Sequence, residues 1–220
     1  MATSSPSQSL REDASVIASR AAMATAALAL IALAALHVLK PELDARRTMI
    51  SRYALGRHGW VMALCFASFS TASACVVIAL VGRVPSALGF VGLALLVVAA
   101  VGLAMASLFP MDAVSTPPAQ MSFTGRMHGV SFLIGVPAQV LGAFVLSLAL
   151  VQQGSHPALP LTALTVLIWL CLIIMIGIMA MVGPGKPPDP NGPERFIGWP
   201  NRLFMISYGA WLMVVAWPLI

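Results

Sequence analysis

The sequence predicts an all-α fold, a polytopic bundle of six transmembrane helices. The 220 residues are 60% hydrophobic and only 9% charged, where a soluble domain carries about 25% charged residues. The apolar residues also form six long runs that do not alternate with polar residues, and each is close to the ~20 residues that cross a bilayer as a helix. We therefore expect one domain that folds in lipid.

The elements follow in order along the chain. Residues 1–20 are polar and rich in serine, so we expect a disordered tail. Residues 21–220 form the transmembrane domain, with expected spans at residues 21–39, 60–81, 87–108, 128–151, 159–182 and 202–219. The first run measures ~28 Å as a helix, close to the hydrocarbon core. Because basic residues precede that run, a cleavable signal peptide is its alternative interpretation.

Small and hydroxyl residues within the spans indicate how the helices pack. Gly102 and Ala106 in the third span, with Gly135 and Gly142 in the fourth, allow the close approach that helix packing in lipid requires. The polar residues of the span interiors are uncharged: Ser68, Ser70, Thr71, Ser73, Gln139, Thr165 and Ser207. We expect the hydroxyls to hydrogen-bond to their own helix or to a neighbour.

Charged residues gather on one side of the predicted bundle. The first, third and fifth loops hold nine cations, Lys40, Arg46, Arg47, Arg52, Arg57, Arg126, Lys186, Arg195 and Arg202, against three on the other side, Arg11, Arg20 and Arg83. Short cytoplasmic loops collect Lys and Arg, so we expect these three loops in the cytoplasm and the protein in a bacterial inner membrane. Acids and histidines share this side, which favours a polar site there. The net charge of +5 indicates contact with lipid phosphates, and nucleic acid is not an expected partner.

Three stretches on this side resemble a known family. They are the segment from Arg47 to Trp60, Phe109-Pro110-Met111-Asp112 with Gly125-Arg126-Met127-His128, and Glu194-Arg195. Together they resemble the family named domain of unknown function 998 (DUF998), over the chain from about Pro41 onward. The resemblance implies six spans and supports the choice of site residues, without a reaction. That family is similar in outline to the FRAG/DRAM/SFK group, whose members are tied to lipid metabolism and membrane organisation.

The candidate site lies where the third span ends and the fourth begins. Asp112 and His128 are the candidate catalytic residues, and the candidate ligand-binding residues are Arg47, Ser51, Arg126, Glu194 and Arg195. All belong to the odd-numbered loops or to adjoining helix ends. Since charges at membrane depth are costly unless paired, we expect one polar cluster, with Asp112 within about 2.7–4 Å of Arg47, Arg126 or His128.

Several functions fit this pattern. The favoured one is binding of lipid headgroups, or membrane organisation, with membrane lipids as partners. One alternative is a lipid-modifying hydrolase that uses Asp112 and His128, with Ser51 as nucleophile; another is a small-solute transporter. In a purely structural role, Asp112 caps a helix or pairs with an arginine, and His128 bonds across helices. No cofactor or metal is expected, because H-E-x-x-H and C-x-x-C are absent; haem held by His37 and His128 is the remaining alternative.

Overall fold

The computed structural model describes residues 6–113, 115–182 and 192–219. Its elements are α1 Pro6–Leu39, η1 Ile50–Ala54, α2 Gly59–Leu80, α3 Ala87–Leu108, η2 Pro118–Gln120, α4 Phe123–Gln152, α5 Ala158–Val182, η3 Pro193–Phe196, α6 Gly198–Ala216 and η4 Trp217–Leu219. Over these residues the chain is helical without strands, and six helices are long and apolar enough to span a membrane. The predicted fold class is confirmed, and the chain is an integral membrane protein.

The N-terminal boundary differs from the prediction. Helix α1 begins at Pro6, so residues 6–20, expected to be a disordered tail, are helical. Ser15, Ala18 and Ser19 are buried on the inner face of this extension, and the Ser15 hydroxyl donates to the Ala79 carbonyl near the end of α2 at 2.9 Å. These side chains are small enough for α1 to continue along α2. Composition alone marked the segment as polar and did not show this packing face.

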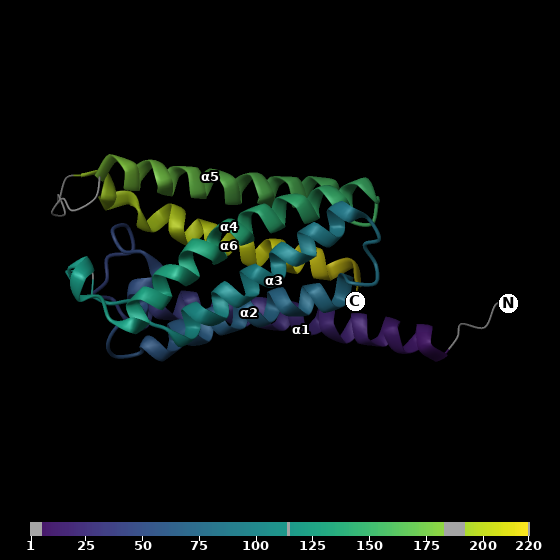
Figure 1. Cartoon of the computed structure of the whole chain (residues 1–220), viewed down its shortest axis with the longest axis horizontal. Helices are drawn as coiled ribbons and strands as arrows, with labels where there is room; N and C mark the ends of the chain where they lie inside the picture. Colours follow the sequence, from purple (N-terminus) through teal and green to yellow (C-terminus); the bar gives the residue numbers. More distant parts are fainter. Residues whose placement is uncertain (1–5, 114, 183–191, 220) are drawn as a thin grey trace.

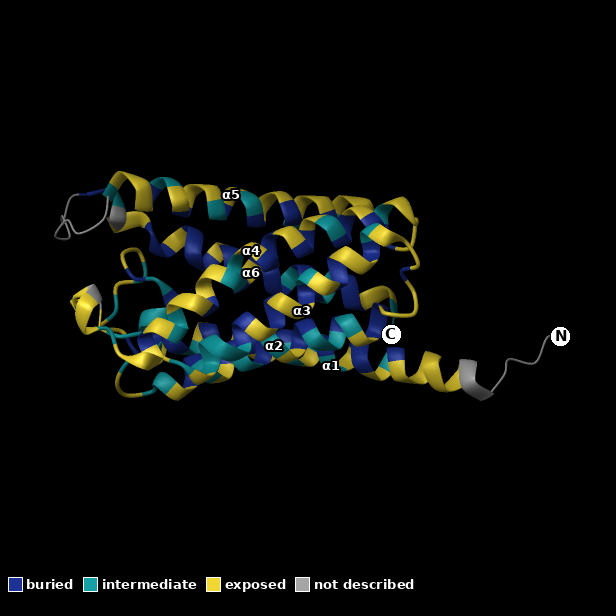
Figure 2. Ribbon diagram, viewed as in Figure 1, coloured by how far each residue is buried: buried dark blue, intermediate teal, exposed yellow. Residues whose placement is uncertain are grey.

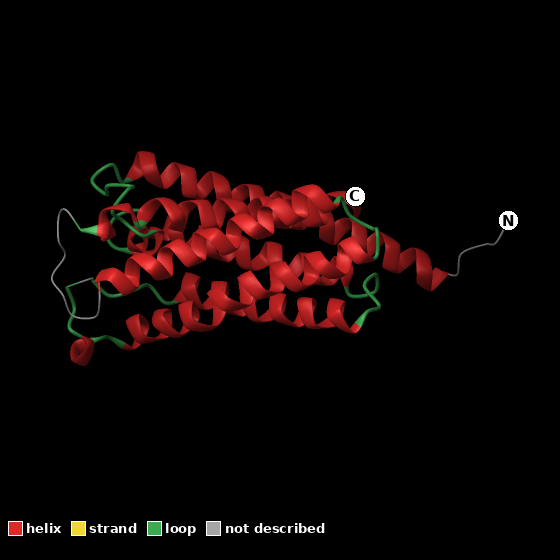
Figure 3. Cartoon of the chain, turned by 90° about the horizontal axis from the view of Figure 1, so that it is seen from above, coloured by secondary structure: helices red, strands yellow, loops and turns green. Residues whose placement is uncertain are grey.

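The six helices run along the long axis of the molecule (Figure 1). Helices α1 to α4 pack against one another in sequence order, α5 packs mainly against α6, and α6 returns to contact α1. Both described ends of the chain lie at one end of the bundle, and the first and third loops lie at the other, as the view from above also shows (Figure 3). The candidate site residues therefore share one end.

The outer surface of the bundle is apolar. Figure 2 shows exposed residues along the outer faces of the helices, and α5 is the most exposed of them. Large apolar side chains such as Leu133 and Leu159 are 71% and 81% exposed. An apolar surface of this extent would cause aggregation in water. In a bilayer it is the surface that contacts acyl chains.

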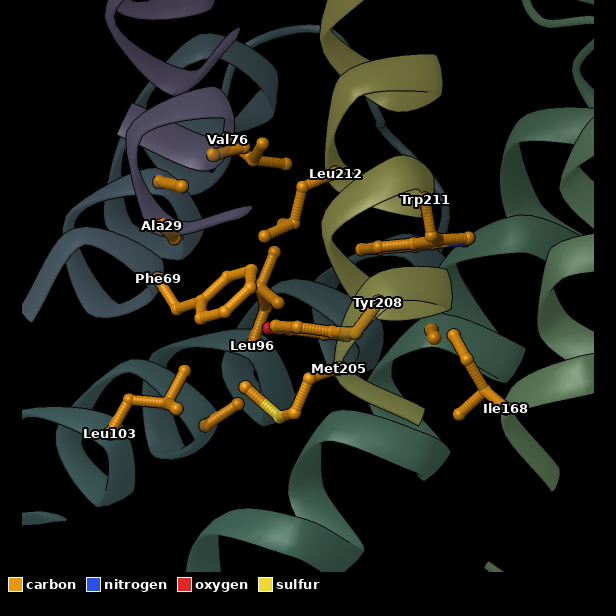
Figure 4. Close-up of a cluster of buried hydrophobic side chains, with 14 of the residues drawn as sticks. Ala29, Phe69, Val76, Leu96, Leu103, Ile168, Met205, Tyr208, Trp211 and Leu212 are labelled. Carbon is orange, nitrogen blue, oxygen red and sulfur yellow. The ribbon is translucent and has the colours of Figure 1, made fainter. Parts of the chain in front are cut away.

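Helix α6 supplies the centre of the core (Figure 4). Tyr208 and Trp211 are fully buried there, and the Tyr208 ring lies 6.2 Å from the ring of Phe69 on α2. The Trp211 indole N–H donates to the Ser147 hydroxyl at 2.8 Å, and the hydroxyls of Tyr208 and Ser73 hydrogen-bond at 2.8 Å. The hydroxyls of Ser73 and Ser147 therefore bond between helices, and that of Thr71 bonds to its own helix at the Ala67 carbonyl, both as expected. The bonds between helices join α6 to α2 and α4 at mid-span.

Glycines bring α3 and α4 into backbone contact. A Cβ added at Gly102 would lie 2.5 Å from the Gly135 Cα, and one added at Gly142 would lie 3.3 Å from the Leu95 Cβ. A Cβ at Gly92 would meet the backbone of Leu146 at 3.0 Å. The predicted use of small residues in these two spans is confirmed. Their contact forms one wall of the cavity described below.

Candidate functional site

Asp112 lies at the N-terminus of α4, where it completes a helix cap. Its carboxylate accepts two hydrogen bonds from Ser122, one from the backbone N–H and one from the hydroxyl, both at 2.7 Å. Ser122 is the N-cap of α4, and its hydroxyl oxygen also accepts from the Gly125 N–H at 3.0 Å. A carboxylate at this position satisfies free backbone donors and interacts favourably with the helix dipole. Helix α4 therefore begins at Phe123, and His128 lies one turn inside it instead of at its start.

The two motifs that flank this loop are tied together by local contacts. A Cβ at Gly125 would lie 2.1 Å from an Asp112 carboxylate oxygen, so only glycine leaves room for the cap. His128 Nδ1 hydrogen-bonds to the Phe109 carbonyl at 2.9 Å, and the Phe109 and Phe123 rings meet edge to face at 6.0 Å. The motif residues thus join the end of α3 to the start of α4.

The single polar cluster expected around Asp112 does not form. Asp112 has no ion pair among the described residues, and Arg126 donates instead to the Met121 carbonyl at 3.3 Å. Arg47 pairs with Asp44 at 3.5 Å, both side chains being about half exposed. The physical reason is the position of Asp112 at the start of α4, where the N–H and the hydroxyl of Ser122 satisfy the carboxylate without an ion pair.

The remaining predicted residues are dispersed over the same end of the bundle. Arg195 is exposed in η3 and its guanidinium lies 4.6 Å from the Phe196 ring centre. Glu194 belongs to the same short helix, but its side chain lies outside what the structure describes. Ser51 is half-buried in η1 and lines a cavity together with His128. Of the seven predicted residues, the structure brings these two to one cavity.

Replacing Asp112 with alanine is expected to lower stability by about 1–2 kcal/mol, because α4 loses its cap. Gly125→Ala should also destabilise the protein, since the new methyl group displaces the carboxylate. In the Asp112→Ala background, however, Gly125→Ala should cost little. Thermal unfolding of the four proteins in detergent measures this coupling. Additive effects would contradict the cap described above.

The most buried charge in the described chain is Arg202 on α6, which is 3% exposed. Its Nε donates to His37 Nε2 at 2.7 Å and one terminal nitrogen donates to the Tyr53 hydroxyl at 2.9 Å. The other terminal nitrogen donates to the carbonyls of Thr48 at 2.6 Å and Gly198 at 3.0 Å. Arg202 thereby ties α1, the first loop and α6 together.

The contact with Arg202 defines which ring nitrogen of His37 accepts a hydrogen bond. Because Arg202 can only donate, His37 Nε2 must accept and carries no proton. The ring's Nδ1 then donates to the Leu33 carbonyl at 2.8 Å. With both nitrogens engaged, His37 is unavailable as a haem ligand.

A second buried cation holds the same loop. Lys40 is 5% exposed, and its Nζ donates to the carbonyls of Tyr53, at 3.2 Å, and Leu55. The loop is closed from the other side by the Gly198 N–H, which donates to the Arg46 carbonyl at 2.8 Å. Sequence reasoning placed Arg202 and Lys40 among the loop cations. A charge inside an apolar helix was the available signal that Arg202 has a specific buried role.

A cavity of about 70 Å³ opens between the helices beside this loop. It is lined by η1 and by α2 to α6, mainly through apolar side chains such as Phe66, Leu103 and Phe204. Its polar lining residues are Ser51, His128, Ser131, Gln139 and Asn201. No charged residue lines the cavity in the part of the chain that the structure describes.

The cavity adjoins a groove on the lipid-facing surface. The groove lies between α4 and α5, has a volume of about 420 Å³, and is lined by apolar residues that include Leu133, Pro137 and Ile176. Phe132, Val136 and Met175 line both the cavity and the groove. Helices α4 and α5 make few contacts with each other. The two spaces therefore share a wall, which these three side chains form.

Asp112 and His128 do not hydrogen-bond to each other in the described part of the chain. His128 Nδ1 is oriented by a backbone carbonyl, and Asp112 bonds to Ser122. No set of three or more His, Cys, Asp or Glu side chains lies close enough to hold a metal ion in the described ranges. What the site offers is an apolar cavity with a few polar groups, which is the usual composition of a small-molecule binding site.

Comparison with known proteins yields one match. A family model with the description "Protein of unknown function (DUF998)" matches residues 23–218. No curated protein and no solved structure matches the chain. The match reaches into all six candidate spans and includes both motifs of the α3–α4 connection.

Proposed function

Because the chain belongs to the DUF998 family, whose description specifies no activity, we propose a function from the cavity itself: the protein binds a membrane lipid between its helices. The observation that carries this proposal is the wall shared by the interior cavity and the α4–α5 groove, formed by Phe132, Val136 and Met175. The groove accommodates an acyl chain, and the polar lining of the cavity accommodates part of a headgroup.

The cations at this end of the bundle support the same function. Arg47 and Arg126 are exposed, and Arg195 is exposed on η3. Exposed arginines near a membrane surface bind lipid phosphates. We propose that they bind the phosphates of surrounding phospholipids and thereby fix the depth at which the cavity lies in the bilayer. In this proposal they contribute to membrane organisation, whereas the cavity selects the bound molecule.

The two alternatives have less support. A hydrolase using Asp112 and His128 would need these side chains in contact, and each has a different partner. A transporter would use the mid-span polar groups, yet the hydroxyls of Ser73 and Ser147 are engaged in bonds between helices. Lipid binding requires neither arrangement.

The orientation is also part of the proposal. Nine cations on the side of the first, third and fifth loops, against three on the other, support a cytoplasmic location for these loops. A reporter that works only in the cytoplasm should then be inactive when fused after Ile220. Strong reporter activity would reverse the assignment.

Native mass spectrometry of the purified protein tests lipid binding. The protein should retain one lipid molecule through mild detergent extraction. Val136→Trp fills the space that the cavity and the groove share, and should reduce retention by about tenfold, or ~1.4 kcal/mol. Val130→Trp is the matched control, because Val130 lies on α4 and is 39% exposed outside the cavity. Equal retention by both variants would show that the cavity is not the lipid site.

A further inference from the structure

Gln139 is a buried side chain without a protein partner. It lies in the middle of α4, is 2% exposed, and lines the cavity. Among the described residues, nothing hydrogen-bonds to its side-chain amide. Every fully enclosed side-chain nitrogen or oxygen in the same residues has a partner, so the Gln139 amide must face the cavity. A buried amide that stays unbonded costs about 1–3 kcal/mol, and the cavity contents therefore have to satisfy it.

The chemistry of the amide restricts what can bind there. A glutamine side chain offers two N–H donors and one carbonyl acceptor. A hydroxyl group matches it, since a hydroxyl both accepts and donates. A phosphate or carboxylate does not, because it would lose its hydration in a cavity lined by no charged residue. An uncharged group that contains a hydroxyl therefore fits the Gln139 amide.

His128 provides a second unbonded acceptor on the same face of α4. Its Nδ1 bonds to the Phe109 carbonyl, which only accepts, so Nδ1 carries a proton. In the neutral ring Nε2 is then an acceptor, and no described residue bonds to it. His128 and Gln139 are eleven residues apart, which places His128 about 16 Å nearer the start of the helix. Polar contacts are thus available at two levels of the cavity along α4.

We propose that the cavity binds an uncharged lipid with a free hydroxyl, such as a diacylglycerol or a long-chain alcohol. The lipid hydroxyl bonds to the Gln139 amide, and His128 Nε2 accepts a hydrogen bond from a further hydroxyl or from water. The acyl chain lies in the α4–α5 groove. This inference rests on the proposed lipid-binding function and specifies the lipid class. It also explains why a polar amide lies at mid-span beside apolar walls.

Photocrosslinking in phosphatidylcholine nanodiscs tests the lipid class. The probe is a diacylglycerol with a diazirine on one acyl chain, and crosslinks are mapped to peptides by mass spectrometry. Crosslinks are expected on α4 and α5. Unlabelled diacylglycerol should compete, whereas its acetyl ester, which lacks the hydroxyl, and phosphatidic acid with the same chains should compete at least about tenfold less well, the effect of one lost buried hydrogen bond.

The Gln139→Leu variant tests whether the Gln139 amide binds the lipid hydroxyl. Leucine has a similar size and removes the unbonded amide, so the melting temperature should stay the same or rise while probe crosslinking falls about tenfold. Gln120→Leu is the matched control, because Gln120 is exposed in η2. Unchanged crosslinking in Gln139→Leu would show that water alone satisfies the amide and would overturn the inference.

Failure of the inference can be told apart from failure of the proposed function. If phosphatidic acid competes as well as diacylglycerol and the Val136→Trp variant loses both, the cavity binds lipid but does not select an uncharged hydroxyl. If no lipid competes and Val136→Trp has no effect, both the lipid class and the lipid-binding function are wrong.

Discussion

Replacing Arg202 with methionine is expected to destabilise the folded protein by about 2–4 kcal/mol. The substitution leaves His37 Nε2, the Thr48 carbonyl and the Tyr53 hydroxyl without their donor in a buried environment. Each buried group left unbonded costs about 1–3 kcal/mol, and part of this cost is offset because a cation no longer has to be desolvated. The effect should appear as a lower melting temperature in detergent.

Arg202→Lys separates the charge from the geometry of the guanidinium. Lysine keeps the positive charge but cannot donate from three nitrogens in a fixed plane. We therefore expect Arg202→Lys to be nearly as unstable as Arg202→Met. Arg57→Met is the control, because Arg57 is exposed in the first loop and should change stability by less than about 0.5 kcal/mol. A lysine variant as stable as the parent protein would show that charge alone is needed.

The loop held by Arg202 also forms part of the cavity wall. Ile50 and Ser51 line the cavity, and the Ile50 N–H donates to the Asn201 side chain at 2.7 Å, one residue before Arg202. Loss of Arg202 should therefore also impair lipid retention, through displacement of this wall. Arg202 acts as a positioning residue in this account, and it does not line the cavity itself.

Gly102→Ala is expected to cost about 1–3 kcal/mol, the range for overpacking a close contact. The added methyl group would lie 2.5 Å from the Gly135 Cα and 3.0 Å from the Gly135 nitrogen. Both are backbone atoms that no rotamer change can move, so α3 and α4 have to separate. Thermal unfolding in detergent measures the loss of stability.

The corresponding substitution on α4, Gly135→Ala, should destabilise the protein less than Gly102→Ala. A Cβ at Gly135 would lie 3.3 Å from the Gly102 Cα, which requires a shift of only a few tenths of an ångström. Gly129→Ala and Gly177→Ala are controls, because a Cβ at either position meets no atom within 4 Å, and alanine favours a helix over glycine. They should leave stability unchanged or raise it slightly. Equal losses at Gly102 and Gly129 would contradict the close contact of α3 with α4.

Local sequence patterns predicted the spans but not the contacts of the polar residues. The motif containing Asp112 was correctly located at the end of α3, yet its partner is the neighbouring Ser122 and none of the arginines. The donors at the start of α4 satisfy this carboxylate without an ion pair. Arg202 was assigned to a loop, because hydropathy does not reveal whether an arginine near a helix end extends to the surface or turns inward.

The sequence by itself determined that this protein folds in a lipid bilayer, and it also determined the fold class and the approximate spans. Long apolar runs cross lipid as helices, because the bilayer core offers the backbone no hydrogen-bond partners and a helix satisfies these groups within its own segment. Only the tertiary structure decided that Arg202 is buried against His37, and that Gln139 faces a cavity without a partner. These features depend on where six helices meet, and a packing arrangement of this kind leaves no periodic signal along the chain.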